Sequence, residues 1–298
     1  MKVAVTGATG FLGRYIVRKL LAEGNTLRCW HRPESDRSGL VDQAGIEWIA
    51  GELNDEQAAA ELVTGCDAVV HSGLYRTSGT FRGDETNISD FLQKNLLGTV
   101  QLIEAARQAK VPRFVFISTC AVHEKILVDR PLDEHHPLLA KTHYGAHKAA
   151  IEQFVHSYGL GMGYDICALR PTGIYGLSHP PQNSKWFQFV SSVVRGEPIH
   201  CQRGGKEVHA SDVASAVDLL LHADDIAGEV YSCYDRYISE WDVAQLAKDI
   251  SGSSAVIDGQ QTRPKHQIVS DKIKALGFRF GGEELLRDTV TELVRHCS

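Results

Sequence analysis

Residues 2–13 constrain the fold of this chain more than any other segment. Residues 2–6 are a short run rich in β-branched side chains, and apolar residues recur at helical spacing soon after it, at Leu12, Ile16, Val17, Leu20 and Leu21. Gly7, Gly10 and Gly13 lie around the junction of the two patterns. The periodicity therefore predicts a strand, a glycine-rich turn and a helix, which together open an α/β fold.

Such a turn presents unpaired backbone N–H groups and the positive end of a helix dipole. This arrangement suits a pyrophosphate where no side chain blocks the approach. The alternative is a turn whose glycines serve only positive φ angles or close packing of helix on strand. The position at the start of a βαβ pattern favours a dinucleotide site.

Strand-like runs recur along the first half of the chain, at 26–30, 46–49, 67–71, 113–118 and 164–169, with helical patterns between them. This alternation predicts a parallel sheet covered by helices on both faces. Residues 88–109 are long enough for a major outer helix, and Asn54 is the predicted cap of a helix that includes 58–62.

After Pro171 the spacing changes, because glycine and proline cluster at 172–182. Helical patterns then follow at 186–195, 208–222, 239–250 and 283–294, the third beginning with a capping box of Ser239 and Asp242. The expected fold is α/β, a Rossmann doubly wound parallel sheet with a smaller C-terminal substrate-binding cap. We expect a dinucleotide-binding domain over 1–171, rejoined by 210–234, and a substrate-binding region over 172–298.

Composition excludes several classes of protein. Of the 298 residues, 43% are hydrophobic and 23% charged, as in ordinary globular domains. No apolar run is long enough to span a membrane, and the chain enters its first strand without a signal-peptide core, so we expect a cytoplasmic protein. A net charge of -6 without a basic tract gives no reason to expect nucleic acid or a membrane as partner.

Cysteine and histidine usage argues against a metal site. The 7 cysteines are odd in number, scattered and never spaced as Cys-x-x-Cys, which predicts reduced thiols. Among the 14 histidines only His135 and His136 are adjacent, and sequence neighbours rarely form a ligand pair alone. We therefore expect no bound metal.

Tyr144 and Lys148 are the strongest catalytic candidates. Residues four apart lie on one face of a helix, so both side chains would point to the carboxyl edge of the sheet. A phenol has a pKa of about 10, and a neighbouring ammonium favours its ionised form. Tyr144 could then exchange a proton with a carbonyl or alcohol oxygen. The alternative, a half-buried Tyr beside an exposed Lys, is weakened because Ser118 and Thr119 end the preceding strand.

Several ordered motifs resemble the extended short-chain dehydrogenase/reductase (NAD-dependent epimerase/dehydratase) superfamily, nearest to its 3β-hydroxysteroid dehydrogenase and dihydroflavonol reductase branch. The matching stretches are Thr6 to Gly13, Asn95 within 94–99, Ile117 to Val122, Tyr144 to Lys148, Leu169 to Gly176 and Val208 to Ala214. The resemblance covers nearly the whole chain.

The resemblance implies a role for each matched residue. Tyr144 would be the acid or base, Lys148 would hold the nicotinamide ribose and lower the pKa of Tyr144, and Thr119 would hydrogen-bond the reacting oxygen. Ser118 is a second candidate for that bond, and Asn95 would orient the site or a relay water unless it only packs the helix. The expected cofactor contacts are Gly7, Thr9, Gly10, Phe11, Leu12, Gly13, His31, Arg32, Glu52, Leu53, Ser72, Gly73, Tyr144, Lys148, Pro171, Thr172 and Gly173.

The end of the second strand favours NADP over NAD. NAD enzymes usually carry a carboxylate there for the ribose hydroxyls, whereas this chain has His31 and Arg32. A guanidinium suits a 2'-phosphate, with Arg37 or Arg14 as possible helpers. NAD stays open, because a solvent-facing Arg after a strand is common. Glu52 is a weaker candidate for a contact beside the adenine.

Departures from the family pattern narrow the reaction. Dehydratases carry an Asp-Glu pair directly after the catalytic Thr, where this chain has Cys120 and Ala121. Gly173 and Lys206 also depart from nucleotide-sugar enzymes, although Lys206 or Arg203 could still bind a phosphate. The expected function is hydride transfer between NADP(H) and a small or hydrophobic carbonyl or alcohol. The alternatives are a nucleotide-sugar epimerase and, in another class, a non-catalytic NADP-binding sensor or scaffold.

The partner is expected to be a small-molecule substrate lying between the sheet edge and the cap. Candidate contacts are Leu74, Tyr75, Cys120 to His123, Thr172 to Ile174, and Trp186. The resemblance also suggests a homodimer that packs through residues 88–109 and 144–158.

Overall fold

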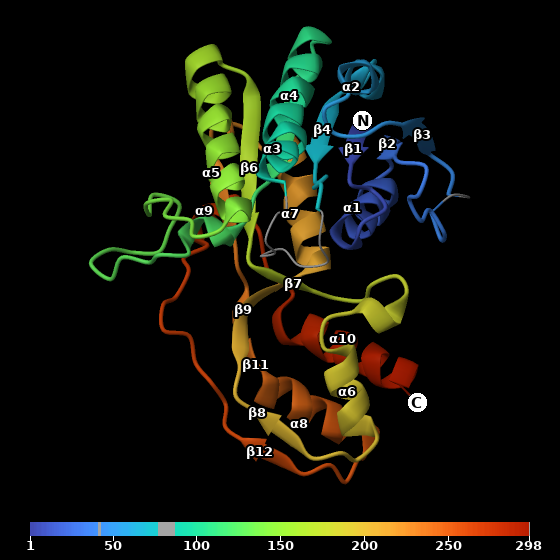
Figure 1. The fold of residues 1–298 in the computed structure, drawn as a ribbon, viewed down its shortest axis with the longest axis vertical. Helices are drawn as coiled ribbons and strands as arrows, with labels where there is room; N and C mark the ends of the chain where they lie inside the picture. The colour runs from blue at the N-terminus through green and yellow to red at the C-terminus, as the bar shows by residue number, and fades with distance from the viewer. Residues whose placement is uncertain (41–42, 77–86, 298) are drawn as a thin grey trace.

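Seven parallel strands form the central sheet of the protein, in the order β10-β6-β5-β4-β1-β2-β3. Figure 1 labels five of them, β6, β4, β1, β2 and β3, from left to right. The computed structural model describes residues 1–40, 43–76 and 87–297. The strands are β1 (Lys2–Thr6), β2 (Thr26–His31), β3 (Ile46–Ala50), β4 (Ala68–His71), β5 (Arg113–Ile117), β6 (Asp165–Pro171) and β10 (Val230–Cys233). The strand order reverses between β1 and β4, and in such sheets ligands bind in the crevice at this point. The predicted Rossmann fold is confirmed.

Helices cover both faces of the sheet. The helices of this part are α1 (Phe11–Ala22), α2 (Glu56–Val63), α3 (Ile88–Leu92), α4 (Gly98–Gln108), α5 (His143–His156) and α7 (Ala210–His222). On one face, α1 and α7 pack against each other and contribute to one hydrophobic cluster. On the other face, α2, α4 and α5 contribute to a second cluster. Along β1, Val3 and Val5 enter the first cluster and Ala4 the second. Both faces of the strand are therefore buried, as in other parallel sheets.

The helix predicted over 88–109 contains an irregular turn. α3 leads into a π-helical turn, Gln93–Leu97, which continues directly into α4. The predicted cap at Asn54 is wrong: Asn54 has a φ of 72°, and the Asp55 side chain accepts the N–H of Ala58 at 3.0 Å. The capping box of Ser239 and Asp242 is present as predicted.

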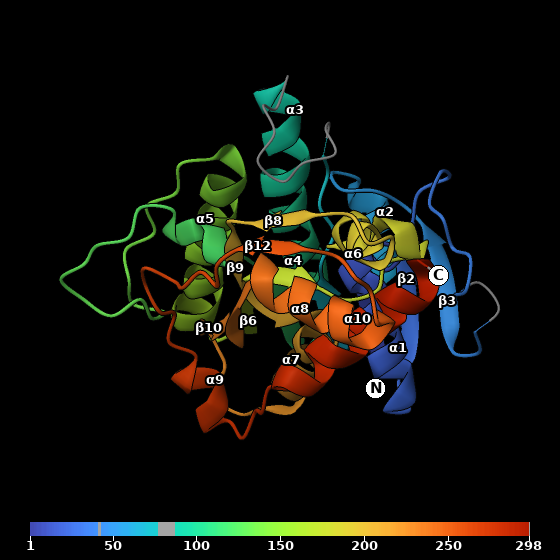
Figure 2. The same cartoon turned by 90° about the horizontal axis from the view of Figure 1, so that it is seen from below.

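The C-terminal elements named next lie together beyond the carboxyl ends of the strands, below the sheet in Figure 1, and are called the cap here (Figures 1 and 2). It contains α6 (Phe187–Val194), α8 (Glu240–Ser251), α10 (Gly282–Cys297), a three-stranded sheet of β7 (Gly173–Tyr175), β9 (Gly204–His209) and β11 (Arg236–Ser239), and a pair of β8 (Ile199–Cys201) and β12 (Ile257–Gly259). A short helix, α9 (Asp271–Ala275), lies beside β10.

The chain passes between sheet and cap more than once. It enters the cap after β6, and β10 then pairs in parallel with β6. The division into two domains stays a prediction. Within the described residues, no helix has both the length and the apolar character needed to cross a membrane.

Candidate functional site

A cavity of about 890 Å³ lies where the strands end and the cap begins. Its lining includes the residues that follow β1, β2, β4, β5 and β6, together with β9 of the cap. Of the predicted site residues, the cavity brings together Gly7, Thr9, Gly10, Phe11, Leu12, Gly13, His31, Arg32, Glu52, Leu53, Ser72, Gly73, Ser118, Thr119, Tyr144, Lys148, Pro171, Thr172 and Gly173. Asn95 is not part of this lining. The roles assigned to these residues stay predictions.

The three glycines of the first turn differ in what surrounds them. Gly7 has a φ of 72°, and a Cβ there would lie 2.8 Å from the backbone of Ser72 and Gly73. A Cβ on Gly13 would lie 1.9 Å from the carbonyl oxygen of Gly7. A Cβ on Gly10 meets only that oxygen, at 3.3 Å. Gly7 and Gly13 therefore permit close packing. Gly10 begins α1 without a side-chain cap, which leaves the N–H groups of its first turn open to an anion.

Buried hydrogen bonds fix the loop that follows β4. His71 Nδ1 lies 2.6 Å from the Thr6 hydroxyl, which also accepts the N–H of Gly73 at 3.0 Å. Burial lowers the pKa of His71 to about 3, so the ring is neutral. Asn95, in the π-helical turn, accepts the N–H of Tyr75 at 2.8 Å and donates to its carbonyl oxygen at 3.0 Å. Asn95 thus holds Tyr75 at the cavity instead of facing it.

Tyr144, Lys148 and Thr119 meet at the end of β5. Thr142 caps α5 by accepting the N–H of Gly145 at 3.1 Å, which sets the start of the helix that carries Tyr144 and Lys148. Lys148 is buried, and its Nζ donates to the carbonyl oxygen of Ile117 at 2.7 Å. Burial lowers the pKa of Lys148 to about 7.

The pKa of Tyr144 departs from the prediction. It is raised, because burial disfavours the phenolate; a hydrogen bond with Thr119 and the charge of Arg76 act in the opposite direction. The predicted lowering by Lys148 is therefore not what the structure shows. The Lys148 ammonium is engaged by the Ile117 carbonyl and lies 4.4 Å from the centre of the Phe116 ring.

Ser118 and Thr119 have different partners. The Ser118 hydroxyl donates to the carboxylate of Glu152 at 2.5 Å. Thr119 instead contacts Tyr144 at the cavity. Of the two candidates for a bond to the reacting oxygen, the geometry favours Thr119.

The end of β2 carries the residues predicted to select the cofactor. The Arg32 guanidinium is exposed at the cavity and pairs with Glu34 at 3.0 Å. Arg14, a predicted helper, is buried and donates to the carbonyl oxygens of Thr9, Asp36 and Ser38 at 3.1, 2.7 and 2.7 Å. The Arg14 guanidinium therefore holds the backbone of these residues together and is not available to the cofactor.

Arg37 and Glu52 occupy different positions at this end of the site. Arg37 lies over the ring of Trp48, 5.6 Å from its centre. Glu52 lines the cavity and is exposed, while Arg37 is not part of the lining. Of the three arginines that the sequence offered for a 2'-phosphate, Arg32 is therefore the one that lines the cavity.

The cavity lining also includes residues that sequence reasoning did not assign to the site. Among them are Ser35, Arg76, Lys94, Glu124, Ile126, Leu132, Gly205, Glu207 and Ile268. Leu132 and Ile268 pair through an isolated β-bridge, which no local pattern reveals. Lys206 lines the cavity and Arg203 does not. The predicted contact at Trp186 also lies outside the lining, because its ring packs on Tyr175 at 5.3 Å.

Two of the residues that line the cavity, His123 and Glu207, have ionisable side chains that are buried. His123 lines the cavity, and burial lowers its pKa to about 4. Glu207 is buried and pairs with Lys185 at 2.5 Å. In the part of the chain that the structure describes, no three His, Cys, Asp or Glu side chains are placed to hold a metal ion.

Comparisons with known proteins agree on the family and differ on the reaction. The NAD dependent epimerase/dehydratase family matches residues 3–233. The 4-hydroxy-2-methyl-3-oxo-4-farnesyl-3,4-dihydroquinoline-1-oxide ketoreductase of Stigmatella aurantiaca is 30% identical over 245 residues, 79% of this chain and 68% of that protein. The dTDP-glucose 4,6-dehydratase of Streptomyces niveus is 28% identical over 254 residues, 78% of this chain and 71% of that protein.

Solved structures show the same fold. UDP-glucose 4-epimerase from Thermus thermophilus, determined in complex with NAD, superposes with a TM-score of 0.78 at 24% identity, covering 99% of each chain. Reductase, dehydratase and epimerase chemistry therefore all occur among the similar proteins.

Proposed function

Because this chain belongs to the NAD dependent epimerase/dehydratase family and is an enzyme of the extended short-chain dehydrogenase/reductase type, we propose that it reduces a carbonyl, or oxidises an alcohol, with NADP(H). The substrate is small or hydrophobic. One observation carries the proposal: Thr119, Tyr144 and Lys148 meet at a cavity, while the positions after Thr119 hold no carboxylate.

The cavity offers groups that fit a dinucleotide. Gly10 leaves the N–H groups of α1 open for phosphates, and Arg32 lies at the end of β2. Thr172 lines the cavity, and its buried hydroxyl has no hydrogen-bond partner among the described residues. We propose that these residues, with Lys148, hold the cofactor, which supplies or accepts the hydride when bound.

The protein's own residues would handle the proton. Tyr144 gives a proton from its phenol oxygen to the substrate carbonyl, or takes one from an alcohol. The Thr119 hydroxyl holds that oxygen in place, and its hydrogen bond with Tyr144 favours the phenolate. Orientation of the substrate by these fixed groups supplies a further part of the rate.

The residues around Thr119 distinguish reduction from dehydration. Cys120 donates its thiol to the carbonyl oxygen of Arg170 at 3.1 Å, and burial raises its pKa to about 12. Ala121 has no ionisable group. Neither can remove a proton as a carboxylate would, which argues against elimination of water.

The wall of the cavity supports an apolar substrate. Ile126, Leu132 and Ile268 line it and pack in one hydrophobic cluster with Cys120. The relative from Stigmatella aurantiaca carries the name of a ketoreductase, which agrees with this substrate class.

Two alternatives stay open. Lys206 favours a nucleotide-sugar epimerase, because its ammonium lines the cavity half-buried and burial lowers its pKa. An anionic group of the substrate would pair with the ammonium and offset the free-energy cost of burying its charge. A non-catalytic NADP-binding sensor is the alternative of another class, but it has no evident use for Thr119, Tyr144 and Lys148 together.

Cofactor titration followed by a substrate panel tests the proposal. We expect NADPH to bind at least about tenfold more tightly than NADH, because one charge-assisted contact contributes about 1.5–3 kcal/mol. NADPH oxidation should then proceed with aldehydes or ketones. Preference for NADH with interconversion of UDP-sugars would assign the protein to the epimerases. Cofactor binding without any turnover would support the sensor.

Arg32→Gln provides the matched variant. Its affinity for NADPH should fall to that for NADH, while the affinity for NADH changes less than about threefold. Arg18→Gln, on the exposed side of α1, should change neither affinity. An unchanged NADPH preference in Arg32→Gln would remove Arg32 from the site.

Exposed apolar side chains support the proposed homodimer. Ile88, Leu92 and Leu97 on α3 and the π-helical turn, and Phe154 on α5, are large and exposed. We expect a dimer by sedimentation at micromolar concentration, and a monomer for Leu97→Glu. Val256→Glu, at an exposed apolar position of the cap region, should remain dimeric. A monomeric wild-type protein would reject the proposal.

A further inference from the structure

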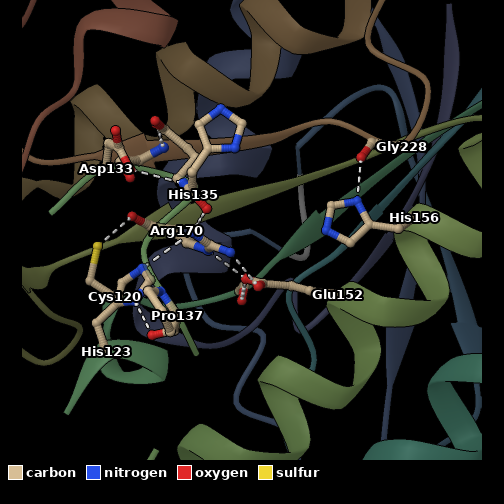
Figure 3. Close-up of polar contacts among 12 residues, drawn as sticks. Cys120, His123, Asp133, His135, Pro137, Glu152, His156, Arg170 and Gly228 are labelled. Carbon is tan, nitrogen blue, oxygen red and sulfur yellow. Dashed lines mark hydrogen bonds and ion pairs between the residues drawn. The ribbon is translucent and has the colours of Figure 1, made fainter. Parts of the chain in front are cut away.

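A buried charged cluster lies behind the catalytic candidates, and its two charged residues, Glu152 and Arg170, are outside the cavity lining. The side chains of Glu152 and Arg170 are only 0% and 1% exposed. Arg170 donates from Nε and Nη2 to the two Glu152 oxygens at 2.9 and 2.7 Å, and Ser118 adds its hydroxyl at 2.5 Å. Figure 3 shows Glu152 reaching from α5 to Arg170 at the centre of this cluster.

Stability alone is a weak reason for such a cluster. Two buried charges lose their hydration, and apolar residues of similar volume often stabilise a fold equally well. The position of the cluster is more informative. Glu152 lies one helical turn after Lys148 on α5, Ser118 directly precedes Thr119, and Arg170 directly precedes the cavity-lining Pro171.

Arg170 also reaches the segment on the cap side of the cavity. Its Nη1 donates to His123 Nε2 at 3.2 Å (Figure 3) and to the Glu134 carbonyl oxygen at 3.2 Å. The Glu134 carboxylate in turn accepts the N–H of Ser232 on β10 at 2.7 Å. One ion pair thus contacts the catalytic helix, the end of β5 and a segment that contributes cavity wall.

We propose that Glu152 and Arg170 are positioning residues that hold Lys148 and Thr119 in register with each other and with the cap-side wall of the cavity. The inference rests on the proposed function. Neither residue touches the cavity, so neither is a catalytic residue. Ser118 belongs to this positioning unit.

Electrostatics gives the pair a second effect. The ionisable groups around Lys148 are Tyr144, His147 and Glu152 on α5 and His71 on β4; Arg170 of β6 faces Glu152. Burial lowers the pKa of both His71 and His147 to about 3, so these rings carry no charge at neutral pH. Glu152 raises the pKa of Lys148 against the effect of burial. Removal of the Glu152 charge should therefore let Lys148 lose its proton at lower pH.

Glu152→Gln tests the inference. We expect kcat/KM to fall about 10- to 100-fold, as for a small displacement of catalytic groups. The high-pH limb of the kcat profile should also move about one pH unit to lower pH, because the Lys148 ammonium is lost earlier. Asp165→Asn is the matched control: Asp165, at the other end of β6 from Arg170, pairs with Arg113 of β5. It should leave kcat/KM and the pH profile unchanged.

A double variant separates positioning from folding. Glu152→Gln leaves Arg170 buried without its partner and can unfold the protein. Glu152→Met with Arg170→Met removes both charges and should fold. We expect it to show the same loss of kcat/KM and the same shift of the pH limb. A double variant with the wild-type kcat/KM and pH profile would overturn the inference.

Cofactor binding keeps this test independent of turnover. If the wild-type protein reduces no carbonyl, the proposed function fails, but the pair can still be tested with NADPH or NADH, whichever binds more tightly. The double variant should lose affinity over a lower pH range than the wild type, in which the pKa of Lys148 is about 7, since its own Lys148 loses charge earlier. Identical pH dependence of binding would overturn the inference.

Discussion

Tyr144→Phe should lower turnover of any carbonyl substrate by about 10²–10⁴-fold, while NADPH affinity stays within about twofold of the wild type. A positioned general acid contributes a factor of this size, and the phenylalanine ring keeps the shape of the site. Steady-state NADPH oxidation and a fluorescence titration measure the two quantities. The ring of Tyr144 lies 5.5 Å from that of His147, a packing contact that phenylalanine retains.

Tyr75→Phe is the control for this result. Tyr75 lines the same cavity, and its ring lies under the ammonium of Lys94 at 4.0 Å. The loss of its hydroxyl should change kcat by less than about threefold. If Tyr144→Phe turned over substrate like the wild type, the catalytic assignment would be wrong, whatever the cofactor binding showed.

Gly13→Ala should destabilise the protein more than any other single methyl group in the first turn. A Cβ there would lie 1.9 Å from the carbonyl oxygen of Gly7, and backbone cannot move aside as a side chain can. Overpacking of this kind costs about 3 kcal/mol or more. The midpoint of urea unfolding measures the loss. A wild-type midpoint would contradict the packing described for α1 on β1.

Gly10→Ala separates packing from binding in the same turn. Its Cβ would meet only the Gly7 oxygen, at 3.3 Å, so we expect a loss of less than about 1 kcal/mol in unfolding free energy. NADPH affinity should nevertheless fall at least about tenfold, because the methyl group would crowd the cavity at the start of α1. Unchanged affinity would mean that the cofactor phosphates do not approach this turn.

The sequence predicted those parts of the site that depend on local periodicity. Strand alternation indicated the parallel sheet, and helical spacing placed Tyr144 and Lys148 on one face of α5. The choice of Thr119 followed from the resemblance to the family's strand-end Ser or Thr. The three glycines were identified together, but the close approach at Gly7 depends on atoms of Ser72 and Gly73, which are distant in sequence.

Other features arise from tertiary contacts or from small local choices. Leu132 and Ile268 come together only through the isolated bridge between distant segments. Asn95 lies in a π-helical turn, where the sequence predicted a regular helix, and its side chain contacts Tyr75 in the loop after β4. Asn54 and Asp55 can both cap a helix, so the spacing alone could not select Asp55.

The buried Arg14 bears on attempts to exchange the cofactor preference by protein engineering. Its guanidinium joins the glycine turn at Thr9 to the loop after β2 at Asp36 and Ser38. A graft that replaces residues 31–38 with the acidic loop of an NAD enzyme would change the side chain at position 32. It would also disturb the backbone of residues 36 and 38, whose carbonyl oxygens accept hydrogen bonds from Arg14. A successful graft has to transfer the residue at position 14 together with the loop.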